Sequence, residues 1–168
     1  MSVSIDYADY YADVIFKSEA QETCYKRIVP WILDIYPPAI ATPASDHPAV
    51  YLAFGSTLAS VDVHPFGANE AAINVTATVV RGTSKMIELL DYLLEENNRL
   101  FFASFSIDTD GTILLRDTLL GSNCDKNELE MSIRTVVEYA NYYDDIIVQR
   151  WSGERALDKP GSNGAASD

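Results

Sequence analysis

Within residues 72–80, AINVTATVV, apolar and polar side chains alternate from Ile73 to Val79, and this pattern constrains the fold more than any other stretch of the chain. Successive side chains of an extended strand point to opposite faces, so every second residue falls on one side. The apolar members are Ile73, Val75, Ala77 and Val79. Residues 49–54 and 59–65 show the same period. Such alternation is typical of an antiparallel sheet with one buried and one solvated face.

Helical periodicity predicts three helices around these strands. The first begins after Ser18, should kink or restart at Pro30, and ends at Pro37-Pro38. The second starts near Ser84, a suitable N-cap, and the third begins at Asp125 with a capping box. The expected apolar stripe of the second helix is Met86, Ile87, Leu90, Leu93 and Leu94. That of the third is Leu129, Ile133, Val136, Val137, Ala140, Tyr143 and Ile147.

Two further strands, residues 100–107 and 112–119, lie between the second and third helices. The resulting order is α-β-β-β-α-β-β-α. Strands grouped between helices predict an α+β fold in which helices cover one face of a five-stranded antiparallel sheet. We expect residues 1–17 to form a flexible, acidic, Tyr-rich arm, residues 18–151 a single α+β domain, and residues 152–168 a disordered tail.

Residues 106–117, SIDTDGTILLRD, match the spacing of a calcium-binding EF-hand loop, with Gly111 at the position where that loop turns. Asp108 and Asp110 are therefore the candidate metal ligands. The flanks favour a different structure, because residues on both sides alternate with period two, whereas an EF-hand loop joins two helices. Asp-Gly is also a favoured hairpin dipeptide. We predict a β-hairpin without a metal, and calcium-responsive binding through 106–117 stays an alternative.

Residues arranged for catalysis are scarce. Ser60, Asp62 and His64 share one face of a predicted strand, but side chains two positions apart on a strand are too nearly parallel to form a nucleophile–base pair unaided. His47 lies in a predicted loop, where a solvated side chain is expected. The neighbouring acids Glu95-Glu96 and Asp144-Asp145 diverge around their helices, so neither pair forms a carboxylate dyad.

The two cysteines do not form a metal-binding or redox motif. Cys24 falls within the first predicted helix, and Cys124 immediately precedes the third, where the helix dipole favours a thiolate and Asp125 opposes it. No CxxC pair, glycine-rich phosphate loop or GxSxG motif is present. We therefore expect neither an enzyme nor a cofactor. A small-ligand-binding protein or an enzyme with an unrecognised pocket, containing His64, Cys124 or paired carboxylates, stays the alternative.

Charge restricts the classes of partner. The chain has 25 acidic against 12 basic residues, a formal net charge of −13 and a pI near 4.4. Nucleic acids and anionic membranes are bound by clustered Lys and Arg, so neither is an expected partner. The first residues contain no basic segment followed by an apolar run, so we expect no signal peptide and a cytoplasmic location with free thiols.

Ten tyrosines among 168 residues suggest a contact surface, because tyrosine combines an apolar ring with a polar tip and is enriched at interfaces. Those predicted to contact a partner are Tyr51, Tyr92, Tyr139, Tyr142 and Tyr143.

The element order, together with the stretch FFASFSIDTDGTILLRDTLLGSNCDKNELEMSIRTVVEYANYYDDII, resembles the type III secretion chaperone-like fold and, within it, the YbjN-like proteins, including small members of cyanobacterial type. The resemblance covers residues 18–151. It implies a small, acidic, homodimeric protein that binds a segment of a partner protein without catalysis. Our leading hypothesis is therefore a chaperone-like or regulatory protein-binding module that uses sheet edges and apolar grooves.

Overall fold

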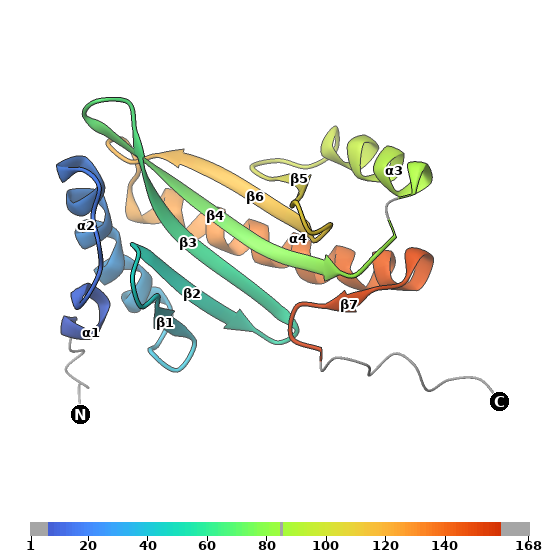
Figure 1. Cartoon of the computed structure of the whole chain (residues 1–168), viewed down its shortest axis with the longest axis horizontal. Helices are drawn as coiled ribbons and strands as arrows, with labels where there is room; N and C mark the ends of the chain where they lie inside the picture. Colours follow the sequence, from blue (N-terminus) through green and yellow to red (C-terminus); the bar gives the residue numbers. More distant parts are fainter. Residues whose placement is uncertain (1–6, 85, 159–168) are drawn as a thin grey trace. The chain divides into compact units, whose positions relative to one another are not determined.

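The computed structural model describes residues 7–84 and 86–158, and the chain adopts an α+β fold with an antiparallel sheet (Figure 1). The helices are α1 (Ala8–Tyr11), α2 (Glu19–Ile35), α3 (Ile87–Asn97) and α4 (Lys126–Trp151). The strands are β1 (Ala41–Pro43), β2 (Ala49–Phe54), β3 (Thr57–Phe66), β4 (Glu70–Arg81), β5 (Ser104–Ile107), β6 (Ile113–Leu120) and β7 (Glu154–Arg155).

The sheet has seven strands in the order β1-β2-β3-β4-β6-β5, and β7 pairs with β4. The predicted number of five strands was therefore too low. The missed strands are β1 and β7, with three and two residues. Neither is long enough to show an alternating pattern in the sequence. β1 pairs with the nearby β2, and β7 pairs with the end of β4, which is distant in the sequence.

The chain divides into two compact units. Unit 1 comprises Met1–Leu52, Ser60–Asn74 and Thr118–Met131, and unit 2 comprises Ala53–Ala59, Val75–Asp117 and Ser132–Asp168. The single domain expected over residues 18–151 stays a prediction. In the segment expected as a tail, residues 154–155 form β7, and residues 159–168 lie outside the described residues.

In unit 1, the buried face of α2 packs in the core. Tyr25, Ile28 and Ile32 are fully buried, and the Ser18 hydroxyl accepts a hydrogen bond from the Gln21 N–H, which caps the helix. Of the two alternatives expected at Pro30, the restart was wrong, because α2 continues through this residue; the kink stays a prediction. Proline lacks an N–H, so it cannot bond to the carbonyl four residues earlier.

Part of the expected N-terminal arm is attached to unit 1. Tyr10 is buried, and its hydroxyl donates to the Ala41 carbonyl of β1 at 2.7 Å. The Tyr11 hydroxyl donates to the Lys26 carbonyl at 3.4 Å, the oxygen that Pro30 leaves without its usual helical donor. Residues 1–6 lie outside the described residues.

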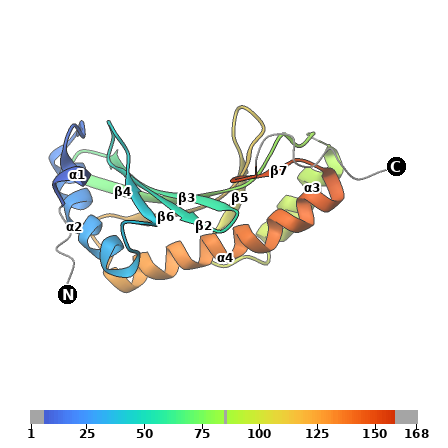
Figure 2. The same cartoon turned by 90° about the horizontal axis from the view of Figure 1, so that it is seen from below.

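In unit 2, α3 lies beside the C-terminal half of α4 (Figure 2), and their aromatic rings are in contact. The α4 residues predicted as a stripe are all buried, and the Asp125 carboxylate accepts from the Glu128 N–H, so the predicted start of this helix is confirmed. The predicted N-cap of α3 was wrong. The helix begins at Ile87, and its N-cap Met86 offers no side-chain hydrogen bond.

The hairpin predicted over residues 106–117 is confirmed. β5 and β6 pair antiparallel, with Ile107 opposite Ile113 and Ser104 opposite Arg116. Gly111 has a φ of 91°, a conformation that glycine adopts without steric cost. The alternating flanks therefore identified the correct local structure.

Candidate functional site

An apolar groove lies between α3 and β5 in unit 2. Its cavity is about 280 Å³. The lining residues are Leu90, Leu93, Leu94, Asn97, Phe105, Ser106 and Ile107. The four residues from α3 are spaced at three and four positions, so they share one face of the helix. We call this site the α3–β5 groove.

Large apolar side chains of the same elements are exposed. Ile87 and Leu94 of α3 are 74% and 65% exposed, and Phe101 and Phe102, in the connection to β5, are 72% and 70% exposed. The sequence predicted an apolar stripe on this helix, and of its five members Leu93 alone is buried. Helical spacing shows that these residues share a face; it does not show that another element covers that face. Contiguous exposed apolar surface is typical of interaction sites.

Phe102 is held in an unfavourable backbone conformation. Its φ is 61°, in the left-handed region that bulky residues rarely adopt. A residue held in this region costs on the order of 1–3 kcal/mol, and such residues cluster at functional sites. The strain at Phe102 therefore coincides with the exposed apolar surface.

β5 is the terminal strand of the sheet order, and Asn97 closes part of its free edge. The Phe105 N–H donates to Asn97 Oδ1 at 2.6 Å, and Asn97 Nδ2 donates to the Phe105 carbonyl at 3.3 Å. Backbone groups of alternate residues in an antiparallel strand face opposite sides, so these groups point away from β6. The Asn97 carboxamide thus makes the two hydrogen bonds that an added strand would make.

Next to Phe105, the Ser106 hydroxyl also lines the groove. Its Oγ atom is buried and has no hydrogen-bond partner among the described residues. A buried hydroxyl without a partner costs free energy, and a ligand that supplies a partner would recover it. The groove therefore combines apolar walls with one buried polar atom that has no hydrogen-bond partner among the described residues.

The predicted tyrosines have different environments. Tyr143 is buried behind the groove; its ring packs on Phe105 with a 5.0 Å centroid distance, and its hydroxyl donates to Glu96 Oε2 at 2.6 Å. Burial and this hydrogen bond raise the pKa of Tyr143. Tyr92 stacks with Trp151, and Tyr142 is exposed beside Tyr143.

The other two predicted tyrosines do not join this group. Tyr51 belongs to unit 1, where its hydroxyl lies 3.5 Å from His47 Nε2. Tyr139 is half-buried on α4. The structure therefore brings together three of the five residues, namely Tyr92, Tyr142 and Tyr143. Their role as partner contacts stays a prediction.

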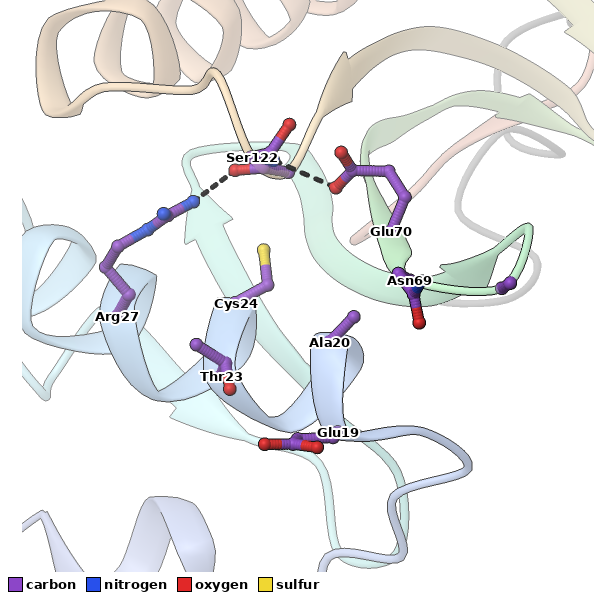
Figure 3. Close-up of a pocket in the computed structure, with 10 residues that line it drawn as sticks. Glu19, Ala20, Thr23, Cys24, Arg27, Asn69, Glu70 and Ser122 are labelled. Atoms are coloured by element: carbon purple, nitrogen blue, oxygen red, sulfur yellow. Dashed lines mark hydrogen bonds between the residues drawn. The ribbon is translucent and has the colours of Figure 1, made fainter.

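A second, more polar pocket of about 410 Å³ lies in unit 1. Cys24 and Arg27 of α2 point toward the connection that carries Ser122, and Glu70 of β4 lies on the other side of that connection (Figure 3). The Arg27 guanidinium donates to the Gly121 carbonyl, and Glu70 Oε1 accepts from the Ser122 N–H at 3.0 Å.

Charge and acidity in this pocket do not favour nucleophilic chemistry. Hydrogen bonds from Ser122 and from the Ala71 N–H hold the pKa of Glu70 below its ordinary value, so this carboxylate is a poor base. Burial raises the pKa of the Cys24 thiol. The sequence could not reveal this pocket, because α2, the turn before β4 and the connection after β6 contribute its residues.

The side chains considered as catalytic candidates do not form a nucleophile–base–acid arrangement. The Ser60 hydroxyl donates to Asp62 at 2.6 Å, and the histidine nearest to Asp62 is His47, at 3.9 Å, which also lies 2.7 Å from Asp46. Burial is the main cause that raises the pKa of Cys124, to about 12. Its position before α4 therefore does not yield a thiolate.

Asp108 and Asp110 serve the hairpin turn. Asp108 Oδ1 accepts from the Thr109 N–H at 2.7 Å, and Asp110 Oδ1 accepts from the Thr112 N–H at 2.8 Å. Within residues 7–84 and 86–158, no group of three His, Cys, Asp or Glu side chains is placed to hold a metal ion. In the same part of the chain, no helix is long and apolar enough to span a membrane.

Comparisons with known proteins agree with this architecture. The family described as "T3SS (YopN, CesT) and YbjN peptide-binding chaperone 1" matches residues 40–159. A chain of the ExsC–ExsE complex is similar in structure, with a TM-score of 0.59 and 14% identity over 77% of this chain and 96% of that one. A chain of the HopA1–SchA chaperone–effector complex has a TM-score of 0.57 and 7% identity over 76% and 98%. No curated protein sequence matches the chain.

Proposed function

We propose that this chain, which belongs to the family of type III secretion (YopN, CesT) and YbjN peptide-binding chaperones, binds a segment of a partner protein in the α3–β5 groove without catalysing a reaction. The match to a family of peptide-binding chaperones supports a protein segment as the ligand. One observation carries the choice of site: an apolar cavity beside a terminal strand, bordered by exposed large apolar residues.

The two ends of the sheet differ in what they offer a peptide. At the other end, β1 has only three residues, includes Pro43, and its Ala41 carbonyl accepts the Tyr10 hydroxyl. Proline on an edge strand is a feature that prevents strand addition, whereas length does not distinguish the two ends, because β5 has only four residues. β5 presents an apolar cavity instead, so a bound segment would bury its side chains against α3 while its backbone lies along Ile107.

Fluorescence anisotropy with a dye-labelled synthetic peptide, in which Leu alternates with Gln, tests this site. Leu94→Asn should weaken binding about tenfold, because burial of a leucine is worth about 1.5–3 kcal/mol. Leu157→Asn is the matched control, since Leu157 is also exposed and also lies in unit 2. Equal affinities of the two variants would refute the site.

The homodimer implied by the family resemblance is a further part of the proposal. Sedimentation equilibrium should give twice the monomer mass of 18.6 kDa. If Leu94→Asn converts a dimer to a monomer, a second copy of the chain uses the groove. A cytoplasmic location is also proposed, and cell fractionation would test it.

The unit 1 pocket favours a second candidate function, the binding of a small polar molecule. Its volume of about 410 Å³ would accommodate one, and Glu19, Arg27 and Asn69 supply both charges and an amide. A thermal-shift screen of small polar metabolites, repeated with Arg27→Met, tests this candidate. A stabilising compound that acts equally on the variant would exclude this pocket as its site.

A further inference from the structure

Helix α3, which forms one wall of the α3–β5 groove, is acidic on its solvent-exposed face. Of the eleven residues in α3, four are acidic and none is basic. Glu96 is buried and engaged by the Tyr143 hydroxyl, whereas Glu88, Asp91 and Glu95 are exposed. Three carboxylates of this helix are therefore accessible to a ligand.

Helix geometry places these carboxylates beside the apolar residues. Asp91 is four residues after Ile87 and three before Leu94, and residues at these spacings are neighbours on a helix surface. Glu95 is four residues after Asp91, so it extends the same acidic stripe. A segment that packs on Leu94 would thus have Asp91 as its nearest carboxylate on α3, with Glu95 one turn further along the acidic stripe.

The other charged residues near the groove leave the electrostatic potential there negative. Asp108 directly follows Ile107 at one end of β5. Arg99 forms an ion pair with Glu96, so its charge is largely compensated. Arg116 lies opposite Ser104 at the other end of β5. The net charge of the chain, −13, adds a long-range attraction for cations.

We propose that the segment bound in the α3–β5 groove is cationic, with Lys or Arg side chains between its apolar residues. Its apolar side chains fill the cavity, while the flexible stems of Lys or Arg bring their charges to Asp91 and Glu95. An acidic segment would meet like charges at the same positions, which disfavours the wrong partner. This inference rests on the function proposed above and specifies the class of ligand.

Three dye-labelled peptides of equal length test the inference: Leu alternating with Lys, with Gln, or with Glu. We expect the order of affinity Lys, then Gln, then Glu. An exposed ion pair is worth about 0.2–1 kcal/mol, so the loss of two in Asp91→Asn/Glu95→Gln should weaken binding of the Lys peptide about two- to thirtyfold and leave the Gln peptide unchanged. Salt raised from about 0.05 M to about 0.5 M should reduce the preference, since screening shortens the range of charge interactions.

The control removes two charges elsewhere. Asp13→Asn/Glu138→Gln changes the net charge equally at exposed positions, and asparagine tolerates the positive φ of residue 13. If this control weakens the Lys peptide as much as the groove variant does, the attraction is non-specific and the inference is wrong.

The remaining outcomes separate the inference from the function on which it rests. If Leu94→Asn weakens all three peptides but they bind equally well, the groove binds peptides and the charge preference is refuted. If no peptide binds, or if Leu94→Asn changes nothing, the proposed site itself fails. If the groove is closed by a second copy of the chain that peptides do not displace, its occupant is not a cationic segment.

Discussion

Replacing Asn97 with alanine should destabilise unit 2 through one residue of β5. The side chain of Asn97 makes two hydrogen bonds with the backbone of Phe105, one as acceptor at 2.6 Å and one as donor at 3.3 Å. Alanine makes neither. Phe105 would then keep its pairing with β6 but lose both partners at the free edge.

The expected cost follows from these two bonds. Each is worth about 0.5–1.5 kcal/mol net, which gives about 1–3 kcal/mol for the pair. Alanine at the last residue of α3 returns roughly 0.5 kcal/mol, because it is a better helix former than asparagine. We expect a net loss of about 1.5 kcal/mol in the free energy of unfolding, or about 3–6 °C in Tm for a chain of this size.

Urea denaturation measures the free energy of unfolding. Hydrogen exchange of the Phe105 amide tests whether the lost hydrogen bond to Asn97 is the cause of the change. This amide should exchange about tenfold faster in Asn97→Ala, since 1.4 kcal/mol corresponds to a factor of ten. Asn98→Ala is the control, because the Asn98 side chain makes one long bond, 3.5 Å, to the Leu94 carbonyl. Equal stability of Asn97→Ala and wild type, or an equal loss in Asn98→Ala, would show that the carboxamide does not hold this edge.

Three further predictions concern ionisable groups. Hydrogen bonds lower the folded-state pKa of Glu70, so its carboxylate stabilises the fold above its unfolded pKa, and this stability is lost as pH falls through the folded pKa. Urea melts from pH 7 to pH 3 should therefore show that the stability difference between wild type and Glu70→Gln shrinks in acid. Because burial raises the pKa of both Cys24 and Cys124, iodoacetamide at pH 8 should label neither thiol in the folded protein and both in urea, and rapid labelling of the folded protein would contradict their burial. Because Asp108 and Asp110 accept backbone N–H groups of the turn, calcium titration should give no heat and no change in Tm, and saturable binding that Asp110→Asn abolishes would restore the EF-hand hypothesis.

Local patterns in the sequence were sufficient for much of the fold. The alternation from Ile73 to Val79 and the stripe of the last helix each depend on a repeated burial period, and the structure confirms both. The resemblance to the secretion chaperone and YbjN-like proteins is likewise confirmed by the family match. Strands too short to show a period were missed: β1 has three residues, and β7 has two and pairs with the distant end of β4.

The groove was only partly predictable. Spacing correctly placed Leu90, Leu93 and Leu94 on one face of α3, but spacing does not show which side chains of a stripe are covered, and the structure leaves Leu94 exposed. The bonds between Asn97 and Phe105 join residues eight apart across a turn, and no periodicity specifies them. The strained Phe102 was also missed, since a positive φ at phenylalanine has no signal in the sequence.

The way Asn97 closes the edge of β5 has a kinetic consequence. An edge covered by a strand becomes free only when several backbone pairs separate, whereas this one becomes free when a single side chain changes rotamer. At a cost of about 1–3 kcal/mol, the open form would make up on the order of one molecule in a hundred to one in ten at equilibrium. Rotamer changes of exposed side chains take picoseconds to nanoseconds, so even a much slower change at the half-buried Asn97 would let a segment bound along Ile107 extend its pairing to Phe105 soon after it arrives.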